Sequence, residues 1–154
     1  MNMAQLIAKI EHAWEDLKSS YAGLSDAQMS ESDVIGNWSV KDTLAHVTTW
    51  EEECLKYLPL ILQGGKPPRY KDLYGGIDVF NAKTTLQKRG GSLTDILEHL
   101  GKVHQQTLNY LDRIPEEQFS HETRFRRRLR LDTYSHYPHH ARLIRAWRDS
   151  FKLD

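Results

Sequence analysis

The sequence predicts an all-α protein that folds as an antiparallel four-helix bundle, with long connections and an interrupted third helix. Two observations support this fold class. Apolar residues recur at helical spacing through four long stretches of the chain, and no stretch shows the apolar–polar alternation of a β-strand. A chain of 154 residues that is 39% hydrophobic also has enough apolar side chains for one core. We therefore expect residues 1–154 to form a single domain.

The first helix is expected to start close to the beginning of the chain. Apolar side chains lie on one side of this segment and charged side chains on the other. The apolar positions are Met3, Leu6, Ile7, Ile10, Ala13, Trp14, Leu17 and Tyr21. Ala22-Gly23 should end the helix, because glycine readily adopts the backbone conformation that follows a last helical turn.

The second helix has a clear start at Ser39. The serine hydroxyl can cap the backbone, and Asp42 follows three residues later as a short capping box. The apolar stripe then continues to Leu62 and stops at Gly64-Gly65. Because prolines cannot continue a helix, Pro67-Pro68 predicts an extended linker after it.

A third helical region is expected from about Ile77 to Leu111. Gly90-Gly91 interrupts it, and Ser92 with Asp95 provides the cap for a new start. We interpret this region as one long helix that is broken at the glycines.

The segment Arg124–Arg130 carries five arginines. We expect a solvated loop in which the arginines pair with Glu116, Glu117 and Glu122. The alternatives are a phosphate-binding patch or a basic rim that attracts an anionic substrate. Because the formal net charge is +0 and no DNA-binding motif accompanies the run, no nucleic-acid partner is expected.

The last helix is expected from about Asp132 to Phe151, and Pro138 lies within it. If the helix begins at Asp132, this proline should kink it, because the ring removes one backbone hydrogen bond. If Ser135 is the residue before the helix, Pro138 falls in the first turn and costs little.

Composition points to a soluble, cytoplasmic protein, and the partner expected for this monomer or homodimer is a small-molecule substrate or ligand. The single cysteine, Cys54, excludes an internal disulfide, which agrees with a reducing compartment. Charged residues interrupt the N-terminal apolar pattern, so no signal peptide is expected. The apolar-leaning run 55–62 is far shorter than the ~20 residues of a membrane span, so no membrane partner is expected.

Three histidines form the most informative candidate site. His136 and His140 are four residues apart, so both imidazoles project from one face of the last helix. His46, in the middle of the second helix, is the candidate third ligand. Three neutral imidazoles with an open position suit a divalent zinc, nickel or iron ion. The alternative is surface or hydrogen-bonded core histidines, and His139 should point elsewhere by about 100°.

Three segments carry a resemblance to a known family. Residues 38–46, which read WSVKDTLAH and are followed by Trp50-Glu51, resemble the second-helix signature of the DinB-like superfamily of four-helix bundles. Residues 132–137, with His140 and the later IRAW at 144–147, resemble its ClbS/DfsB branch. The segment 77–82 resembles the start of the third helix of that branch.

The resemblance implies a divalent metal held by one histidine of the second helix and two of the last, here His46, His136 and His140. It also implies a protective hydrolase that opens an electrophilic ring, such as a cyclopropane, with water. Without a metal, these histidines would act as acid, base or substrate-binding groups. The alternatives are a metal-dependent thiol transferase and a non-catalytic protein that sequesters its ligand.

Other residues are candidates for the same pocket. Glu53 is a candidate general base and Tyr57 a candidate phenolic donor; a solvated charge and an interfacial ring are the alternatives. We also expect four side chains to line a substrate pocket, although the tryptophans equally suit the core. These four are Trp38, Trp50, Asn81 and Tyr137.

Three further residues have simpler interpretations. Asp42 either orients the second nitrogen of His46 or only completes the helix cap, and we favour the cap. His104 falls on the apolar stripe of the third helix, which predicts a buried histidine with a hydrogen-bond partner. Cys54 lies beside the leucine stripe, so burial is expected rather than nucleophilic chemistry.

Overall fold

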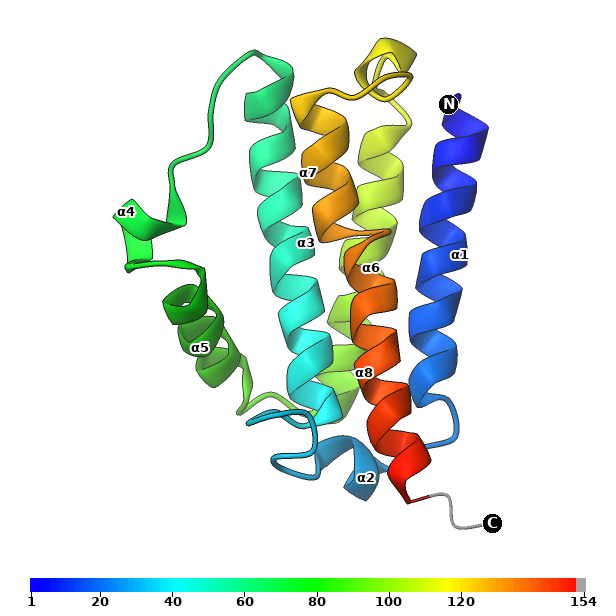
Figure 1. Ribbon diagram of the computed structural model, residues 1–154, viewed down its shortest axis with the longest axis vertical. Helices are drawn as coiled ribbons and strands as arrows, with labels where there is room; N and C mark the ends of the chain where they lie inside the picture. Colours follow the sequence, from blue (N-terminus) through cyan, green and yellow to red (C-terminus); the bar gives the residue numbers. More distant parts are fainter. Residues whose placement is uncertain (152–154) are drawn as a thin grey trace.

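The computed structural model describes residues 1–151, and its helices form the expected bundle (Figure 1). Three long helices contribute one rod each: α1 (Met3–Tyr21), α3 (Val40–Leu62) and α6 (Leu93–Leu111). The fourth rod consists of two shorter helices, α7 (Arg124–Asp132) and α8 (His136–Ser150). Apart from a single bridge between Ile35 and Trp38, the described residues contain no β-structure. The all-α fold class is therefore confirmed for the part of the chain that the structure describes.

The expected helix starts are formed by capping boxes. Asn2 and Gln5 cap α1, and Ser39 and Asp42 cap α3 through reciprocal side-chain to backbone hydrogen bonds. These bonds satisfy amide groups that have no partner within the helix. The expected ends of α1 at Tyr21 and of α3 at Leu62 also agree with the structure.

The third helical region is interrupted as expected, but its two parts have different surroundings. α5 (Ile77–Lys88) ends before Gly90-Gly91, and α6 begins at Leu93. α5 lies beside α3 outside the bundle, together with the short α4 (Tyr70–Tyr74), whereas α6 packs in the bundle (Figure 1). Only Phe80 and Thr85 of α5 are buried, so its contact with α3 is narrow.

The expectation of a loop for the arginine-rich segment was wrong, because it forms α7. Phe125 and Leu129, four residues apart, are buried on one face and anchor the helix in the core. Thr123 caps the start by accepting a hydrogen bond from the amide of Arg126. The arginines occupy the remaining faces, as in other amphipathic helices.

A break over residues 133–135 separates α7 from α8. Thr133 has φ −129° and ψ −95°, outside the helical region. α8 begins at His136, after Ser135, so Pro138 lies in its first turn, as the second alternative predicted. Across the break, α7 packs mainly against α3, and α8 packs mainly against α1.

The two remaining elements close the ends of the bundle: α2 (Asp26–Ser30) and a short 3-10 helix, η1 (Glu116–Gln118). The core between the rods consists of aliphatic and aromatic side chains that are completely buried. It includes Leu6, Ile10, Leu17, Leu44, Leu58, Leu111, Phe119, Leu129, Tyr137 and Ile144. Among the described residues, no helix combines the length and the apolar character needed to cross a membrane.

Candidate metal centre

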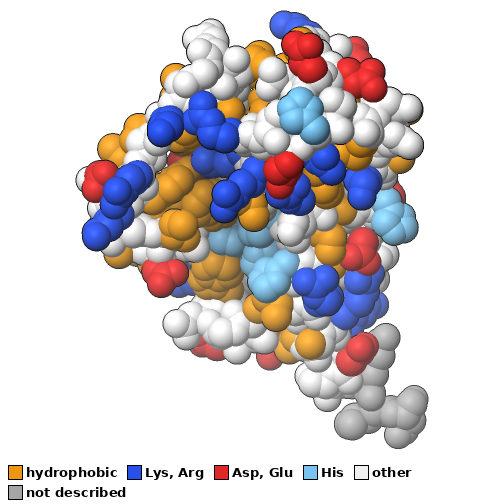
Figure 2. Space-filling view, turned by 45° about the horizontal axis from the view of Figure 1, so that its top comes forward, with side chains coloured by type: hydrophobic (Ala, Val, Ile, Leu, Met, Phe, Trp, Pro, Cys, Tyr) orange, Lys and Arg blue, Asp and Glu red, His pale blue; other side chains and the backbone are white. Residues whose placement is uncertain are grey.

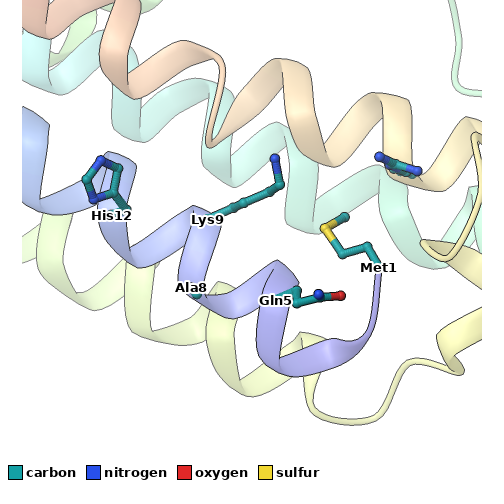
Figure 3. Close-up of a pocket in the computed structure, with 6 residues that line it drawn as sticks. Met1, Gln5, Ala8, Lys9 and His12 are labelled. Atoms are coloured by element: carbon teal, nitrogen blue, oxygen red, sulfur yellow. The ribbon is translucent and has the colours of Figure 1, made fainter.

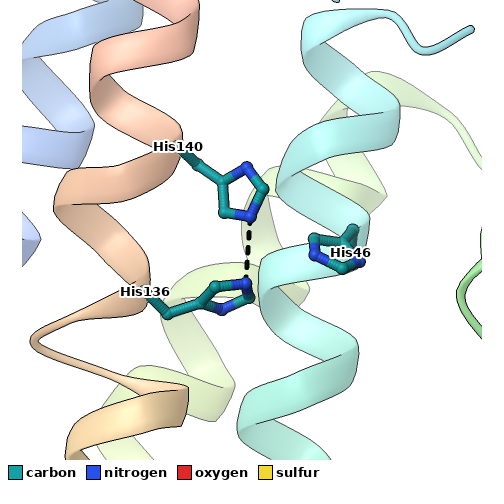
Figure 4. Close-up of side chains that lie close together, drawn as sticks. All are labelled: His46, His136 and His140. Carbon is teal, nitrogen blue, oxygen red and sulfur yellow. Dashed lines mark hydrogen bonds between the residues drawn. The ribbon is translucent and has the colours of Figure 1, made fainter. Parts of the chain in front are cut away.

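Three histidines from α3 and α8 meet in one place (Figure 4). One ring nitrogen from each of His46, His136 and His140 lies within 4.8 Å of the others. The Nε2 atoms of His136 and His140 are 2.9 Å apart. The ring centroid of His46 lies 5.1 Å from that of His136 and 4.9 Å from that of His140. The helical spacing of four in α8 and the packing of α8 beside α3 together create this cluster.

The three imidazoles are neutral near pH 7. His46 and His140 are buried, and His136 is half-buried. Burial, which removes the hydration of the charged form, and the neighbouring imidazoles together lower the pKa of each ring to about 3. Neutral imidazole is the form that binds a metal ion.

The donor set fits a divalent metal. In all three rings the Nδ1 atom is buried without a hydrogen-bond partner among the described residues. In His136 and His140 it is the Nε2 atoms that face each other, at 2.9 Å, so Nε2 is the nitrogen that these two rings turn toward a shared ligand. Three imidazole nitrogens with an open side suit zinc, nickel or ferrous iron.

A cavity of about 490 Å³ opens onto the cluster. Trp38, Trp50 and Asn81, expected as pocket residues, all line it, and the indole Nε1 of Trp50 donates a 2.8 Å hydrogen bond to Oδ1 of Asn81. Figure 2 shows histidines in a hollow beside apolar side chains, with Lys and Arg side chains gathered next to it. The other lining residues are Ile77, Leu131, Asp132, His139 and the three clustered histidines. The exposed His139 thus borders the cavity outside the cluster.

Asp132 is a site residue that the sequence interpretation missed. It is the last residue of α7, it lines the cavity, and only 5% of its surface is exposed. Burial raises its pKa to about 6, although the nearby charge of Arg128 opposes the rise. The spacing of four between Arg128 and Asp132 was a visible signal, but it points to a pair only if the segment is helical.

Arg128 is the centre of a polar and aromatic group behind the cavity. Its Nε donates to Asp132 at 2.5 Å, and a second nitrogen donates to the hydroxyl of Tyr70 at 2.9 Å. Tyr70 in turn donates to Glu53 at 3.2 Å, and the guanidinium carbon lies 5.5 Å from the ring centre of Tyr57. Of the two residues expected to be catalytic, Tyr57 thus lies beside Arg128 and Glu53 is linked to it through Tyr70, and neither lines the cavity.

Tyr137 also lies elsewhere than expected. It follows His136 on α8, and the turn of the helix directs its ring into the core, where it is fully buried. Its hydroxyl forms hydrogen bonds with Glu51 and, at 3.1 Å, with Nδ1 of His104. It does not line the histidine cavity.

The remaining expectations concern structural residues. Asp42 completes the cap of α3 and pairs with Arg89 at 3.2 Å, in agreement with the favoured interpretation. His104 is buried, with Glu11 at 2.6 Å as its second partner. Cys54 is fully buried, and burial raises the pKa of its thiol.

Comparison with known proteins agrees with this architecture. The sequence model of the DinB superfamily matches residues 9–143. A search of the curated proteins found no sequence match to this chain.

Several solved structures share the fold at low sequence identity. An uncharacterised protein from Escherichia coli UTI89 superposes with a TM-score of 0.81 at 15% identity, covering 99% of this chain and 96% of that one. DfsB, described as a sibling lethal factor precursor, gives 0.80 at 15% identity, covering 100% and 99%. The colibactin self-resistance protein ClbS, solved in complex with double-stranded DNA, gives 0.78 at 15% identity, covering 99% and 98%.

Proposed function

The chain belongs to the DinB superfamily, and from this membership we propose that it is a protective hydrolase that opens an electrophilic small molecule with water. The structural similarity to ClbS and DfsB gives this proposal its direction. The observation that carries it is the cluster of His46, His136 and His140 at the base of a cavity with aromatic walls.

These three histidines would hold a divalent metal ion. When bound, the ion supplies Lewis acidity, which polarises the substrate and lowers the pKa of water at its open position. Because the imidazoles are neutral, they need not lose a proton before they bind a cation.

Asp132 would handle protons for the reaction. Its Oδ2 is held by Arg128, and the carboxyl group borders the cavity. A carboxyl group whose pKa lies near 6 can accept a proton and return it close to neutral pH. As the oxygen of water bonds to the electrophilic ring carbon, Asp132 accepts the water's proton. The ring C–C bond breaks, and its electron pair moves to the carbonyl group conjugated to the ring. Asp132 returns the proton to that carbonyl system, so the net change is addition of water.

Apolar and amide groups would orient the substrate. Trp38, Ile77 and Leu131 offer apolar surface that excludes bulk water from the reacting carbon. Asn81 uses its Oδ1 for Trp50, which leaves its amide NH₂ to donate to a substrate oxygen. Glu53 and Tyr57 would act indirectly in this scheme: Tyr57 lies against the arginine that holds Asp132, and Glu53 is linked to that arginine through Tyr70.

Metal analysis of purified protein tests the centre directly. Protein prepared without chelators should contain a stoichiometric divalent metal, and His46→Ala and His140→Ala should each lose it. His121→Ala is the matched control, because that imidazole is exposed and, among the described residues, has Ser120 as its hydrogen-bond partner. Metal-free protein that takes up no added zinc, nickel or iron, or full occupancy in both variants, would contradict the metal assignment.

The hydrolase assignment has its own test. Incubation with a cyclopropane conjugated to a carbonyl should give the water-addition product, and Asp132→Asn should lower kcat roughly hundredfold or more. If turnover requires a low-molecular-weight thiol, the protein is a thiol transferase. If the compound binds tightly without conversion even after all three histidines are replaced by alanine, it is a sequestering protein.

A nucleic-acid role has less support in this chain. ClbS was solved with double-stranded DNA, but most arginines of α7 have partners here. Arg130 makes two hydrogen bonds with Glu122, and Arg124 donates to the carbonyl groups of residues 64 and 65. Fluorescence anisotropy with a labelled duplex at physiological salt decides this point, since submicromolar binding would add DNA as a partner.

A further inference from the structure

A second cavity, of about 620 Å³, lies between α1 and α7 (Figure 3). The break over residues 133–135 explains it. Because α8 packs mainly against α1 while α7 packs mainly against α3, the N-terminal half of α1 is not covered by the fourth rod. The cavity is lined by Met1, Gln5, Ala8, Lys9, His12 and Arg126.

One face of α1 forms most of this cavity. Gln5, Ala8, Lys9 and His12 follow each other at helical spacing, while the core residues Leu6 and Ile10 of the same helix face inward. Met1 and Ala8 contribute apolar surface, and the amine of Lys9 extends from the helix into the space (Figure 3). This side of the cavity therefore combines the apolar surface of Met1 and Ala8 with the cationic side chain of Lys9.

The cavity has an excess of positive charge. Lys9 and Arg126 line it from two different helices, and none of its lining residues is acidic. Lys9 makes no ion pair with a described residue. The Nε of Arg126 is buried without a hydrogen-bond partner.

The nearest carboxylate only partly compensates this charge. Glu122 lies 4.0 Å from the Nε of Arg126, but it is bound more closely by Arg130, at 2.6 Å and 2.9 Å. The guanidinium of Arg126, which lines the cavity, is therefore available to an acceptor that enters there.

We propose that this cavity binds a small organic anion, with its anionic head between Lys9 and Arg126 and its apolar chain along Met1 and Ala8. The imidazole of His12 supplies a further hydrogen-bond donor at the edge of the cavity. A volume of about 620 Å³ is in the range of small-molecule sites. No residue is shared with the histidine cavity, so this site stands apart from the proposed hydrolase activity.

NMR titration of the ¹⁵N-labelled full chain tests the proposal with octanoate, octyl phosphate and neutral 1-octanol. Both anions should shift the amide signals of Gln5, Ala8, Lys9 and Arg126 to saturation. Octanol should bind at least tenfold more weakly, because it lacks the charge that Lys9 and Arg126 recognise. Comparison of the two anions shows whether a carboxylate or a phosphate head is preferred.

Matched variants identify the charges responsible. Arg126→Ala and Lys9→Ala should each weaken octanoate binding roughly tenfold, about the contribution of one charge-assisted hydrogen bond. Arg127→Ala removes the same charge at the next position of α7, outside this cavity, and Lys102→Ala removes a lysine charge on α6. Both control variants should bind octanoate with the affinity of the original protein.

Three results would overturn the proposal, provided the spectra show folded variants. They are equal binding of octanol and octanoate, shifts confined to the histidine cavity, and unchanged affinity in Arg126→Ala.

Discussion

A hydrogen bond between the hydroxyl of Tyr137 and the carboxyl group of Glu51 joins α8 to α3 deep in the core. Tyr137 is the residue after His136, and Glu51 lies five positions after His46 on α3. The same hydroxyl lies 3.1 Å from Nδ1 of His104, whose Nε2 is 2.6 Å from Glu11. Four helices are thus linked by one chain of hydrogen bonds beside the histidine cluster.

The number of protons in this chain of hydrogen bonds follows from its geometry. Three hydrogen bonds connect Glu11, His104, Tyr137 and Glu51, and each needs one proton. The phenol and a neutral imidazole supply two, so the third lies either on Glu51 or on the second nitrogen of His104. Burial raises the pKa of Glu51 to about 7 and lowers the pKa of His104, which places this proton on Glu51 below pH 7.

Tyr137→Phe should destabilise the protein by about 1–3 kcal/mol, because it removes one of the two hydrogen-bond partners of Glu51, which keeps Thr107, and one of the two partners of His104, which keeps Glu11. Urea denaturation measures the change. Tyr110→Phe is the control: its hydroxyl is buried without a hydrogen-bond partner among the described residues, so its removal should not destabilise the protein. Equal effects of the two variants would show that the Tyr137 bonds do not stabilise the fold.

Glu51→Gln should alter how stability depends on pH. The folded-state pKa of Glu51 is raised above the usual 4.5, so its contribution is complete below pH 4.5 and is lost as pH rises to about 7. Glutamine keeps the hydrogen-bond pattern of the protonated acid at every pH. From pH 5 to 8 the original protein should therefore lose roughly 2–3 kcal/mol relative to the variant in urea denaturation. Parallel pH curves would contradict this assignment of the proton.

Arg128→Met should destabilise the protein by about 3 kcal/mol, because Asp132 would remain buried without its partner. Asp132→Asn added to this variant removes the uncompensated charge and should recover part of the loss. A double-mutant cycle measured by urea denaturation quantifies the coupling. Arg127→Met, at an exposed neighbouring position, should change stability little. Additive effects at Arg128 and Asp132 would contradict the pairing.

Asn81→Ala should loosen α5. This helix packs on α3 over a small area, and the bond from Trp50 to Asn81 is one of its few polar links to the bundle. Hydrogen exchange followed by mass spectrometry should show severalfold faster exchange in residues 77–88, with α6 unchanged. Asn109→Ala, which removes an exposed bond on α6, serves as control. Unchanged exchange in α5 would mean that Phe80 and its aromatic neighbours hold the helix alone.

Local chemistry explains why much of the fold could be predicted from the sequence. Ser39 with Asp42, and Ser92 with Asp95, mark helix starts because a side-chain oxygen satisfies nearby amide groups, whatever the rest of the chain does. Spacing of four likewise placed His136 and His140 on one face of α8. The candidate metal ligands were therefore visible as a set, with His46 added by its resemblance to a known signature.

Tertiary packing decided the rest. The arginine-rich segment has too few apolar residues to indicate a helix by itself, and only burial of Phe125 and Leu129 against the bundle makes α7 stable. With α7 in place, Asp132 reaches the histidine cavity. The break over residues 133–135 then directs Tyr137 toward Glu51 and leaves the second cavity open between α1 and α7. Spacing along one helix fixes which side chains share a face, but which faces meet depends on contacts between segments distant in sequence.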